Sequence, residues 1–368
     1  MSLLFRDVEG DCLCPHGSVV CIGAFDGLHL GHRALVGRAV AHARELGVEA
    51  VALSFEPLPR EFFASARQPP QLPPSRLSLP RAKFEGLRAL GVDRIGLLRF
   101  DARMAALSAR DFIEHVLVRR LHAREVWVGP EFRFGHGRAG DLALLREMGE
   151  QHGFAANEIT PMLIDGERVS SSAIRALLAA GDLDAAAHLL GRPYAIAGKV
   201  LRGQQLGRTL GYPTANLRLG GKTPALGGIF ATLVHGLGDA FARCVEAHRA
   251  RSRAPEAGGE GPGCLARPWT AEHSNGQRGI AERGAGWPSV SSLGTRPTVH
   301  GTERLLEAHL FDFDGDLYGR RIEVEFVAKL RDELRFDDLD ALTVQMHRDA
   351  TQARAMLGMQ EQRRGAMA

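Results

Sequence analysis

Ten consecutive residues near the N-terminus, 23–32, have the composition of a loop that binds phosphate. The candidate nucleotide-binding residues in it are two histidines, three glycines, a phenylalanine and an aspartate: His29, His32, Gly23, Gly27, Gly31, Phe25 and Asp26. Glycines let the backbone approach an anion closely, and imidazoles supply further hydrogen-bond donors. We therefore predict a triphosphate site, in which Asp26 orients the nucleotide or only forms a turn. The alternative for the histidines taken alone is a surface or helix-capping role.

A second group of polar residues occurs in segment 168–175. Ser170 and Ser171 stand at the predicted start of a helix, and Arg175 follows in its first turn. N-capping explains one serine but not the whole cluster. A guanidinium beside the free N–H groups of a helix start would stabilise a triphosphate, so these three residues are predicted to bind nucleotide.

In the C-terminal half, a glycine-rich loop leads into a rigid turn. The loop contains the candidate nucleotide-binding residues Gly203, Gly207 and Arg208, and the turn presents the hydroxyl of Thr214 and the amide of Asn216. Oxygen donors of this kind suit Mg²⁺ carried on a nucleotide. A plain turn without a ligand is the alternative.

Four motifs resemble, in the same order, those of the bacterial bifunctional riboflavin kinase/FMN adenylyltransferases, also called FAD synthetases. They are segments 23–32, 129–135, 168–175 and 211–216, the last being similar to the signature Gly-x-Pro-Thr-Ala-Asn. The resemblance extends from about residue 18 to 357, apart from one insertion. It implies an enzyme that phosphorylates riboflavin to FMN with ATP and Mg²⁺ and then adenylylates FMN to FAD.

The resemblance also implies roles for residues of the kinase half. Thr214 and Asn216 match the positions that bind Mg²⁺ and phosphate, and Arg331 and Arg335 match the segment that borders the flavin. An alcohol is a poor nucleophile at neutral pH, so the ribityl hydroxyl needs a general base, and Glu307 matches that position. The alternatives are an exposed salt bridge for Glu307 and a solvated charge run for the arginines.

For adenylyl transfer, the resemblance implies that His29 and His32 contact the phosphates and the transition state. Phe132 and Phe134 would then line the flavin or the adenine, although at least one of them is expected to fill the core. The chain departs from the family pattern at four positions: Leu58 replaces a histidine, Glu131 an aspartate, and Val169 and Ser172 make conservative changes. The first two departures put the corresponding contacts in doubt.

The elements that must position the N-terminal motifs alternate between apolar strands and amphipathic helices. We expect strands near 19–22, 51–55, 94–98 and 125–128, and helices near 32–46, 81–90, 109–121 and 141–152. This alternation predicts an α/β domain with a parallel, Rossmann-like sheet covered by helices. The loops 23–32, 55–59 and 129–137 should then meet at the carboxyl edge of the sheet.

After residue 193 the pattern changes to short strands separated by glycine-rich turns. Strands near 194–201, 228–235, 290–293, 306–311 and 321–330 predict an antiparallel β-barrel, and residues 339–357 predict a helix packed on it. We therefore expect an FMN adenylyltransferase domain over 1–187, a riboflavin kinase domain over 188–358, and a tail over 359–368.

Residues 240–286 fit neither pattern, because they are rich in Gly, Ala, Arg and Glu. They predict a disordered insertion in a loop of the barrel, where extra length adds little closure entropy. Two alternatives follow: a monofunctional FMN adenylyltransferase whose kinase domain the insertion damages, or a flavin-binding regulator without catalytic activity.

Bulk properties exclude some classes of protein. A formal charge of +3 over 368 residues, without a dense basic stripe, does not favour nucleic acid as a partner. We expect a cytoplasmic protein, because no signal peptide or membrane-spanning stretch is present, and the five scattered cysteines predict reduced thiols. The sequence leaves the oligomeric state open.

Overall fold

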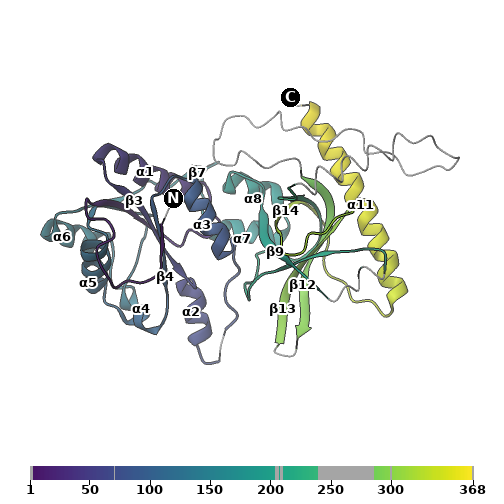
Figure 1. Cartoon of the computed structure of the whole chain (residues 1–368), viewed down its shortest axis with the longest axis horizontal. Coiled ribbons are helices and arrows are strands. Elements are labelled where there is room, and N and C mark those ends of the chain that lie inside the picture. The colour runs from purple at the N-terminus through teal and green to yellow at the C-terminus, as the bar shows by residue number, and fades with distance from the viewer. Residues whose placement is uncertain are drawn as a thin grey trace. The chain divides into compact units, whose positions relative to one another are not determined.

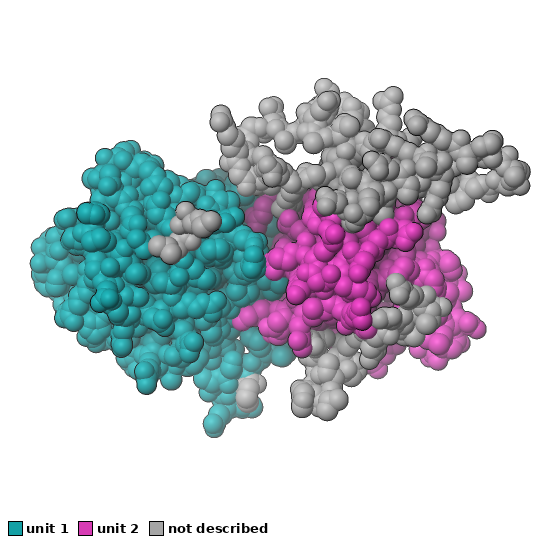
Figure 2. Space-filling view, viewed as in Figure 1, with its two compact units in different colours: residues 1–175, 189–191 teal, residues 176–188, 192–368 magenta. Residues whose placement is uncertain are grey.

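The structure is a computed structural model that describes residues 3–69, 71–203, 207, 210–238, 286–298 and 301–366. The chain divides into two compact units, residues 1–175 with 189–191 and residues 176–188 with 192–368 (Figure 2). The expected domain boundary near residue 187 stays a prediction. The expected insertion lies outside the described residues, apart from its last position.

A six-stranded parallel sheet forms the centre of the first unit (Figure 1). Its strands are β1 (Leu3–Phe5), β2 (Ser18–Ile22), β3 (Glu49–Glu56), β4 (Arg94–Arg99), β5 (Ala123–Val128) and β6 (Ala155–Glu158), in the spatial order β1-β4-β3-β2-β5-β6. The order reverses beside β2, because β3 and β4 lie on one side of it and β5 and β6 on the other. Open α/β sheets bind ligands at such a switch point, and segment 23–32 leaves β2 there.

Helices cover both faces of this sheet because the side chains of each strand alternate between two apolar cores. Val20 and Ile22 of β2 pack with α5, α6 and a π-helical segment, whereas Val19 and Cys21 pack with α1 and α3. The helices of this unit are α1 (Leu30–Leu46), α2 (Pro59–Ala66), α3 (Pro80–Ala89), α4 (Ala102–Ala106), α5 (Ala109–Phe112), the π-helix Ile113–Arg120 and α6 (Leu142–His152). The chain continues through α7 (Ser171–Ala180) and α8 (Leu183–Leu190), whose residues 176–188 belong to the second unit. A short hairpin, β7 (Leu163–Ile164) and β8 (Glu167–Arg168), precedes α7.

The second unit contains a closed antiparallel barrel with the strand order β10-β13-β12-β11-β14-β9. The strands are β9 (Ala195–Leu201), β10 (Ala215–Arg218), β11 (Gly228–His235), β12 (Trp287–Thr298), β13 (Gly301–Leu310) and β14 (Arg321–Arg331). β11 pairs with β12, with Val234 opposite Trp287, so the segments that flank the predicted insertion are neighbours in the barrel. The terminal helix α11 (Leu339–Ala366) packs on the barrel through Ala350, Ala353 and Leu357.

The predicted fold class is confirmed, and the differences concern short or capped elements. The sequence pattern missed β1, β6 and β10, which have three or four residues each; such short strands carry too few residues for a periodic signal, and pairing with a neighbour defines them. Helix α1 begins at Leu30 rather than His32, because His29 caps it. Helix α11 continues to Ala366 rather than ending at residue 357.

No helix among the described residues is long and apolar enough to cross a membrane.

Two helical glycines should respond in opposite directions to alanine. A Cβ at Gly149 of α6 would lie 2.3 Å from the carbonyl oxygen of Phe154, whereas a Cβ at the exposed Gly37 of α1 would meet nothing within 4 Å. We expect Gly149→Ala to lower the free energy of unfolding by roughly 1–3 kcal/mol, and Gly37→Ala to raise it by roughly 0.5–1 kcal/mol. Urea unfolding of both variants tests this, and a similar response of the two would contradict the packing described for α6.

Candidate functional site

The predicted phosphate loop ends in a stacked pair of histidines at the start of α1. His29 caps the helix, since its Nδ1 accepts a hydrogen bond from the backbone N of His32 at 3.3 Å. The two imidazole centroids are 3.6 Å apart and the ring planes differ by 20°. An imidazole that accepts at Nδ1 carries its proton on Nε2, so Nε2 of His29 is a hydrogen-bond donor.

His32 is available as a neutral hydrogen-bonding group. Burial, followed by the neighbouring positive groups, holds the pKa of His32 well below its usual value. Its Nδ1 is buried and has no hydrogen-bond partner among the described residues. A buried imidazole nitrogen without a partner is costly unless a ligand supplies one. The capping alternative therefore accounts for His29 and leaves His32 unexplained.

The other residues of this loop form its backbone and its core side. Phe25 is fully buried in the α1 core, and its ring lies edge-on to His32, with centroids 5.4 Å apart. Gly27 has φ +86°, and a Cβ there would lie 2.9 Å from Leu77. At Gly31 a Cβ would come within 3.4 Å of the His29 ring. Phe25 thus packs beneath the loop, while Gly27 allows its close contact with Leu77 and Gly31 its close contact with the His29 ring.

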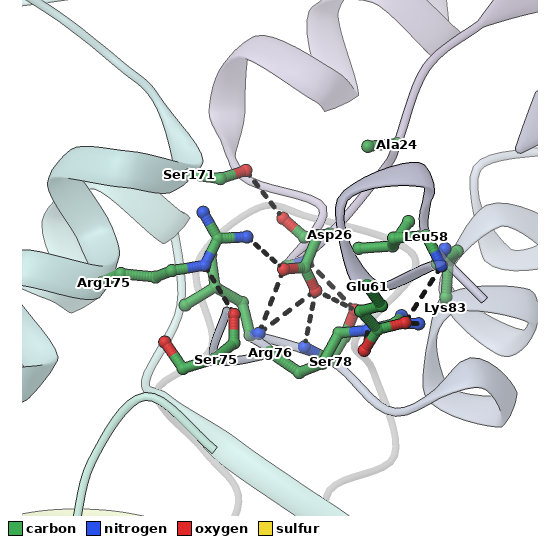
Figure 3. Close-up of polar contacts among 12 residues, drawn as sticks. Ala24, Asp26, Leu58, Glu61, Ser75, Arg76, Ser78, Lys83, Ser171 and Arg175 are labelled. Carbon is green, nitrogen blue, oxygen red and sulfur yellow. Dashed lines mark hydrogen bonds and ion pairs between the residues drawn. The ribbon is translucent and has the colours of Figure 1, made fainter. Parts of the chain in front are cut away.

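Asp26 and Arg175 meet in a buried ion pair, which joins two motifs that are 149 positions apart (Figure 3). The Asp26 side chain is 1% exposed and also accepts hydrogen bonds from the backbone N of Leu77 and Ser78, at 3.1 and 3.0 Å. Ser171 donates its hydroxyl to the backbone oxygen of Asp26 at 3.1 Å. The Asp26 carboxylate is therefore occupied by protein donors and holds the site together.

The two predicted serines at the start of α7 make different contacts: Ser171 bonds to Asp26, and Ser170 caps the helix. Ser170 accepts a hydrogen bond from the backbone N of Ala173 at 3.1 Å, which is an N-cap contact. Arg175 donates Nε to the carbonyl oxygen of Ser75 at 2.7 Å and Nη2 to Asp26. The third nitrogen, Nη1, is buried without a hydrogen-bond partner among the described residues. It is the donor that remains for a ligand anion.

A buried charge network beside Asp26 was missed by sequence reasoning. Arg76 and Lys83 are 2% and 0% exposed, and they lie near the carboxylates of Glu56 and Glu61. Lys83 donates to the hydroxyl of Ser54 at 3.1 Å. Burial, and then the charge of Arg76, lowers the pKa of Lys83 to about 8. A lysine on the apolar side of a predicted helix was the only signal available from the sequence.

In the aromatic loop after β5, one of the two predicted phenylalanines is buried and the other is partly exposed. Phe134 is buried in the core, in contact with Phe112, while the partly buried Phe132 stacks on Phe134 with centroids 5.3 Å apart. Glu131 is exposed and pairs with Arg168 at 3.4 Å. The expectation that one phenylalanine fills the core agrees with the position of Phe134.

Four other phenylalanines form an aromatic surface that the motif search did not single out. Phe100 lies within 5.5–5.8 Å of the rings of Phe55, Phe62 and Phe63, at the carboxyl ends of β3 and β4 and on α2. Phe63 is 49% exposed. Leu58, which stands where the family pattern has a histidine, is 2% exposed and occupies the N-cap position of α2.

The second unit has a cavity of about 270 Å³ inside the region bounded by the barrel and α11. Thr214, Glu307 and Arg331 line it, as does Gly207 of the glycine-rich loop. Arg335 is exposed and does not line it, and Arg208 lies outside the described residues. Further lining residues include Tyr212, His309 and Glu333 from the predicted motifs and, from α11, Met346 and Asp349, which the sequence had not indicated as site residues.

The pairing of β10 with β13 brings the kinase residues together. Asn216 stands directly opposite Glu307 in this antiparallel register, so both side chains lie on one face. The amide nitrogen of Asn216 donates to the backbone oxygen of Thr214 at 3.2 Å, while its Oδ1 is buried without a partner among the described residues. A Cβ at position 203 would lie 2.8 Å from the Asn216 amide, so any residue other than Gly203 would push this amide from its position.

Neighbouring contacts hold this wall of the cavity in place. His309, two residues after Glu307, donates from Nδ1 to the carbonyl oxygen of Pro213 at 2.9 Å, and burial lowers its pKa. Arg331 forms a fork with Asp349 of α11, with Nε–Oδ1 and Nη2–Oδ2 distances of 2.9 and 2.6 Å. Arg331 is thus already paired with a carboxylate of the protein.

Comparison with known proteins covers both units. Residues 13–173 match the FAD synthetase family and residues 190–357 the riboflavin kinase family. The chain is 38% identical over 357 residues to the bifunctional riboflavin kinase/FMN adenylyltransferase of Escherichia coli (strain K12), covering 97% of this chain and 98% of that protein. It is 39% identical over 342 residues to the protein of that name from Pseudomonas fluorescens, covering 92% and 93%.

The fold also matches a solved structure described as a macrolide-efflux protein from Streptococcus pneumoniae. The TM-score is 0.67, with 24% identity over 96% of this chain and 98% of that one. At this identity the likeness concerns the fold alone.

The buried Lys83 gives a pH-dependent stability that can be measured. Its pKa is about 8 in the folded protein and 10.5 for a lysine side chain in water, so the unfolded chain binds more protons between these values. The contribution of Lys83 to stability should therefore rise with pH in this window, by up to about 1.4 kcal/mol per pH unit. Urea unfolding at pH 7.5 and 10 should show wild type gaining stability relative to Lys83→Met; an unchanged difference would contradict it.

Proposed function

The chain belongs to the bifunctional riboflavin kinase/FMN adenylyltransferase family, and we propose that it makes FAD from riboflavin in two ATP-dependent steps. The second unit phosphorylates riboflavin to FMN, and the first unit transfers AMP from ATP to FMN and releases pyrophosphate. The substrates are small molecules: ATP, riboflavin and FMN. The free thiols of Cys12, Cys14 and Cys21 and the use of ATP support a cytoplasmic location as part of this proposal.

For the kinase step, Glu307 is proposed as the general base. It takes the proton of the terminal ribityl hydroxyl while that oxygen attacks the γ-phosphorus of ATP, and the bond to the ADP oxygen breaks. The observation that carries this assignment is the register of β10 and β13, which sets Asn216 opposite Glu307 beside a cavity of about 270 Å³.

Mg²⁺ is proposed to accompany ATP in this step. Oδ1 of Asn216, which is buried and has no hydrogen-bond partner in the described part of the chain, and the nearby hydroxyl of Thr214 are hard oxygen donors that fit this cation. Among the described residues no cluster of three or more His, Cys, Asp or Glu could hold a metal ion. When bound, Mg²⁺ neutralises phosphate charge.

For the adenylyl step, no protein nucleophile is needed, because an oxygen of the FMN phosphate attacks the α-phosphorus of ATP. The protein aligns the reactants and stabilises the charge that develops. We propose that Nε2 of His29, the imidazole of His32 and Nη1 of Arg175 donate to the phosphates at the N-terminus of α1. The exposed aromatic surface around Phe63 is proposed as an apolar side for the flavin, together with Phe132.

Glu307→Gln should abolish FMN formation and spare adenylylation. Loss of the general base lowers kcat of the kinase step by roughly 10²–10⁴-fold. Chromatography of flavins during incubation with riboflavin, ATP and Mg²⁺ should show FMN before FAD for wild type, and only added FMN should be converted by the variant.

Glu323→Gln, on β14 and outside the cavity, is the matched control with normal kinetics. Equal loss of both steps in Glu307→Gln would contradict the two-site assignment, and conversion of neither flavin by wild type would favour a binding protein.

His29 offers a test that separates catalysis from capping. Asparagine is a good N-cap residue but lacks the imidazole donor, so His29→Asn should keep the melting temperature near that of wild type. Its FAD formation should nevertheless fall by about 10²-fold or more, as should that of His29→Ala, while the kinase step continues. The exposed His152→Ala serves as the control. An active His29→Asn beside an inactive His29→Ala would reduce His29 to a helix cap.

A further inference from the structure

Arg76 is a buried guanidinium in the middle of the loop that joins α2 to α3. Its Nε and Nη2 are hydrogen-bonded to carboxylates, whereas its Nη1 has no hydrogen-bond partner among the described residues. Its Nε donates to Oε1 of Glu61 at 2.7 Å, and its Nη2 donates to Oε2 of Glu61 at 2.6 Å and to Glu56 at 2.7 Å. Arg76 is 2% exposed. A buried pair of this kind adds little net stability, because desolvation offsets its attraction, so the pair calls for another explanation.

The residues on both sides of Arg76 hold the Asp26–Arg175 pair (Figure 3). The carbonyl oxygen of Ser75 accepts from Nε of Arg175 at 2.7 Å, and the backbone N of Leu77 and Ser78 donate to Asp26 at 3.1 and 3.0 Å. Segment 75–78 thus makes backbone contacts with both members of the pair.

The Arg76 side chain anchors this segment to α2, since Glu61 belongs to that helix. Glu61 is itself held in place, because its Oε2 accepts a hydrogen bond from the backbone N of Leu58 at 3.0 Å. A fork of two parallel hydrogen bonds defines both position and orientation, which a single ammonium group does not. The anchor therefore sets where the Ser75 carbonyl lies, and this carbonyl sets the plane of the Arg175 guanidinium.

We propose that Arg76 is a positioning residue for adenylyl transfer: through segment 75–78 it orients Arg175, so that Nη1 of Arg175 faces the ATP phosphates. This inference rests on the proposed role of Arg175 as a phosphate ligand. It requires no contact between Arg76 and the substrate.

The test is Arg76→Lys in the full-length chain, which keeps the charge and loses the fork. Its kcat/KM for ATP in FMN adenylylation should fall by roughly 10- to 100-fold, the range expected for a misplaced catalytic contact. The kinase activity of the same sample, which depends on the other unit, should stay normal. Arg94→Lys is the matched control, because Arg94 makes a similar fork with Glu49, at 2.7 and 2.8 Å, at the opposite, amino end of the strands.

A double-mutant cycle with Arg175→Ala distinguishes positioning from a general structural effect. If Arg76 acts through Arg175, Arg76→Lys should have no further effect on kcat/KM in the Arg175→Ala background. Additive losses, or an unchanged kcat/KM in Arg76→Lys beside a clear loss in Arg175→Ala, would overturn the inference alone. A normal kcat/KM in Arg175→Ala would overturn the proposed role of Arg175 and the inference with it.

A second variant covers the case in which Arg76→Lys fails to fold. Glu61→Gln retains one acceptor oxygen for the fork and removes a negative charge, so a smaller loss of kcat/KM in the same direction is expected. The melting temperature of each variant is measured beside its kinetics. A Glu61→Gln protein with wild-type kcat/KM would overturn the inference.

Discussion

The burial of the Asp26 carboxylate is the constraint on which the first unit depends. A carboxylate that is 1% exposed must be compensated by hydrogen bonds and an opposite charge, because water cannot solvate it. The donors to this carboxylate come from two segments that are distant from Asp26 in the sequence, segment 75–78 and the first turns of α7. Satisfying one carboxylate therefore brings the nucleotide motifs together at the carboxyl edge of the sheet.

The same requirement explains the second layer of charges. Positive Arg76, Lys83 and Arg175 face negative Asp26, Glu56 and Glu61 in a region that is almost free of solvent. Removing a single member would leave a buried charge without compensation, so the network favours one arrangement of the loop. The sheet supplies a rigid edge, and the charges fix the polypeptide that crosses it.

The barrel achieves its alignment by a different means. There, strand register rather than ion pairing sets Asn216 opposite Glu307, because antiparallel partners present their side chains on a common face. A slip of one residue would turn Glu307 away from the cavity. Closure of the barrel on both sides of β13 makes that slip costly, and β11 and β12 pair with each other along seven residues.

The sequence by itself determined the two fold classes and the order of the motifs, since apolar periodicity and short signatures are local properties. It did not reveal that Asp26 pairs with Arg175, that Phe134 rather than Phe132 is the buried phenylalanine, or that Arg76 and Lys83 lie in the same charge network. Those features depend on which groups lose contact with water and which partners then lie within hydrogen-bond distance. Such pairings join residues up to 149 positions apart, so only the tertiary structure decided them.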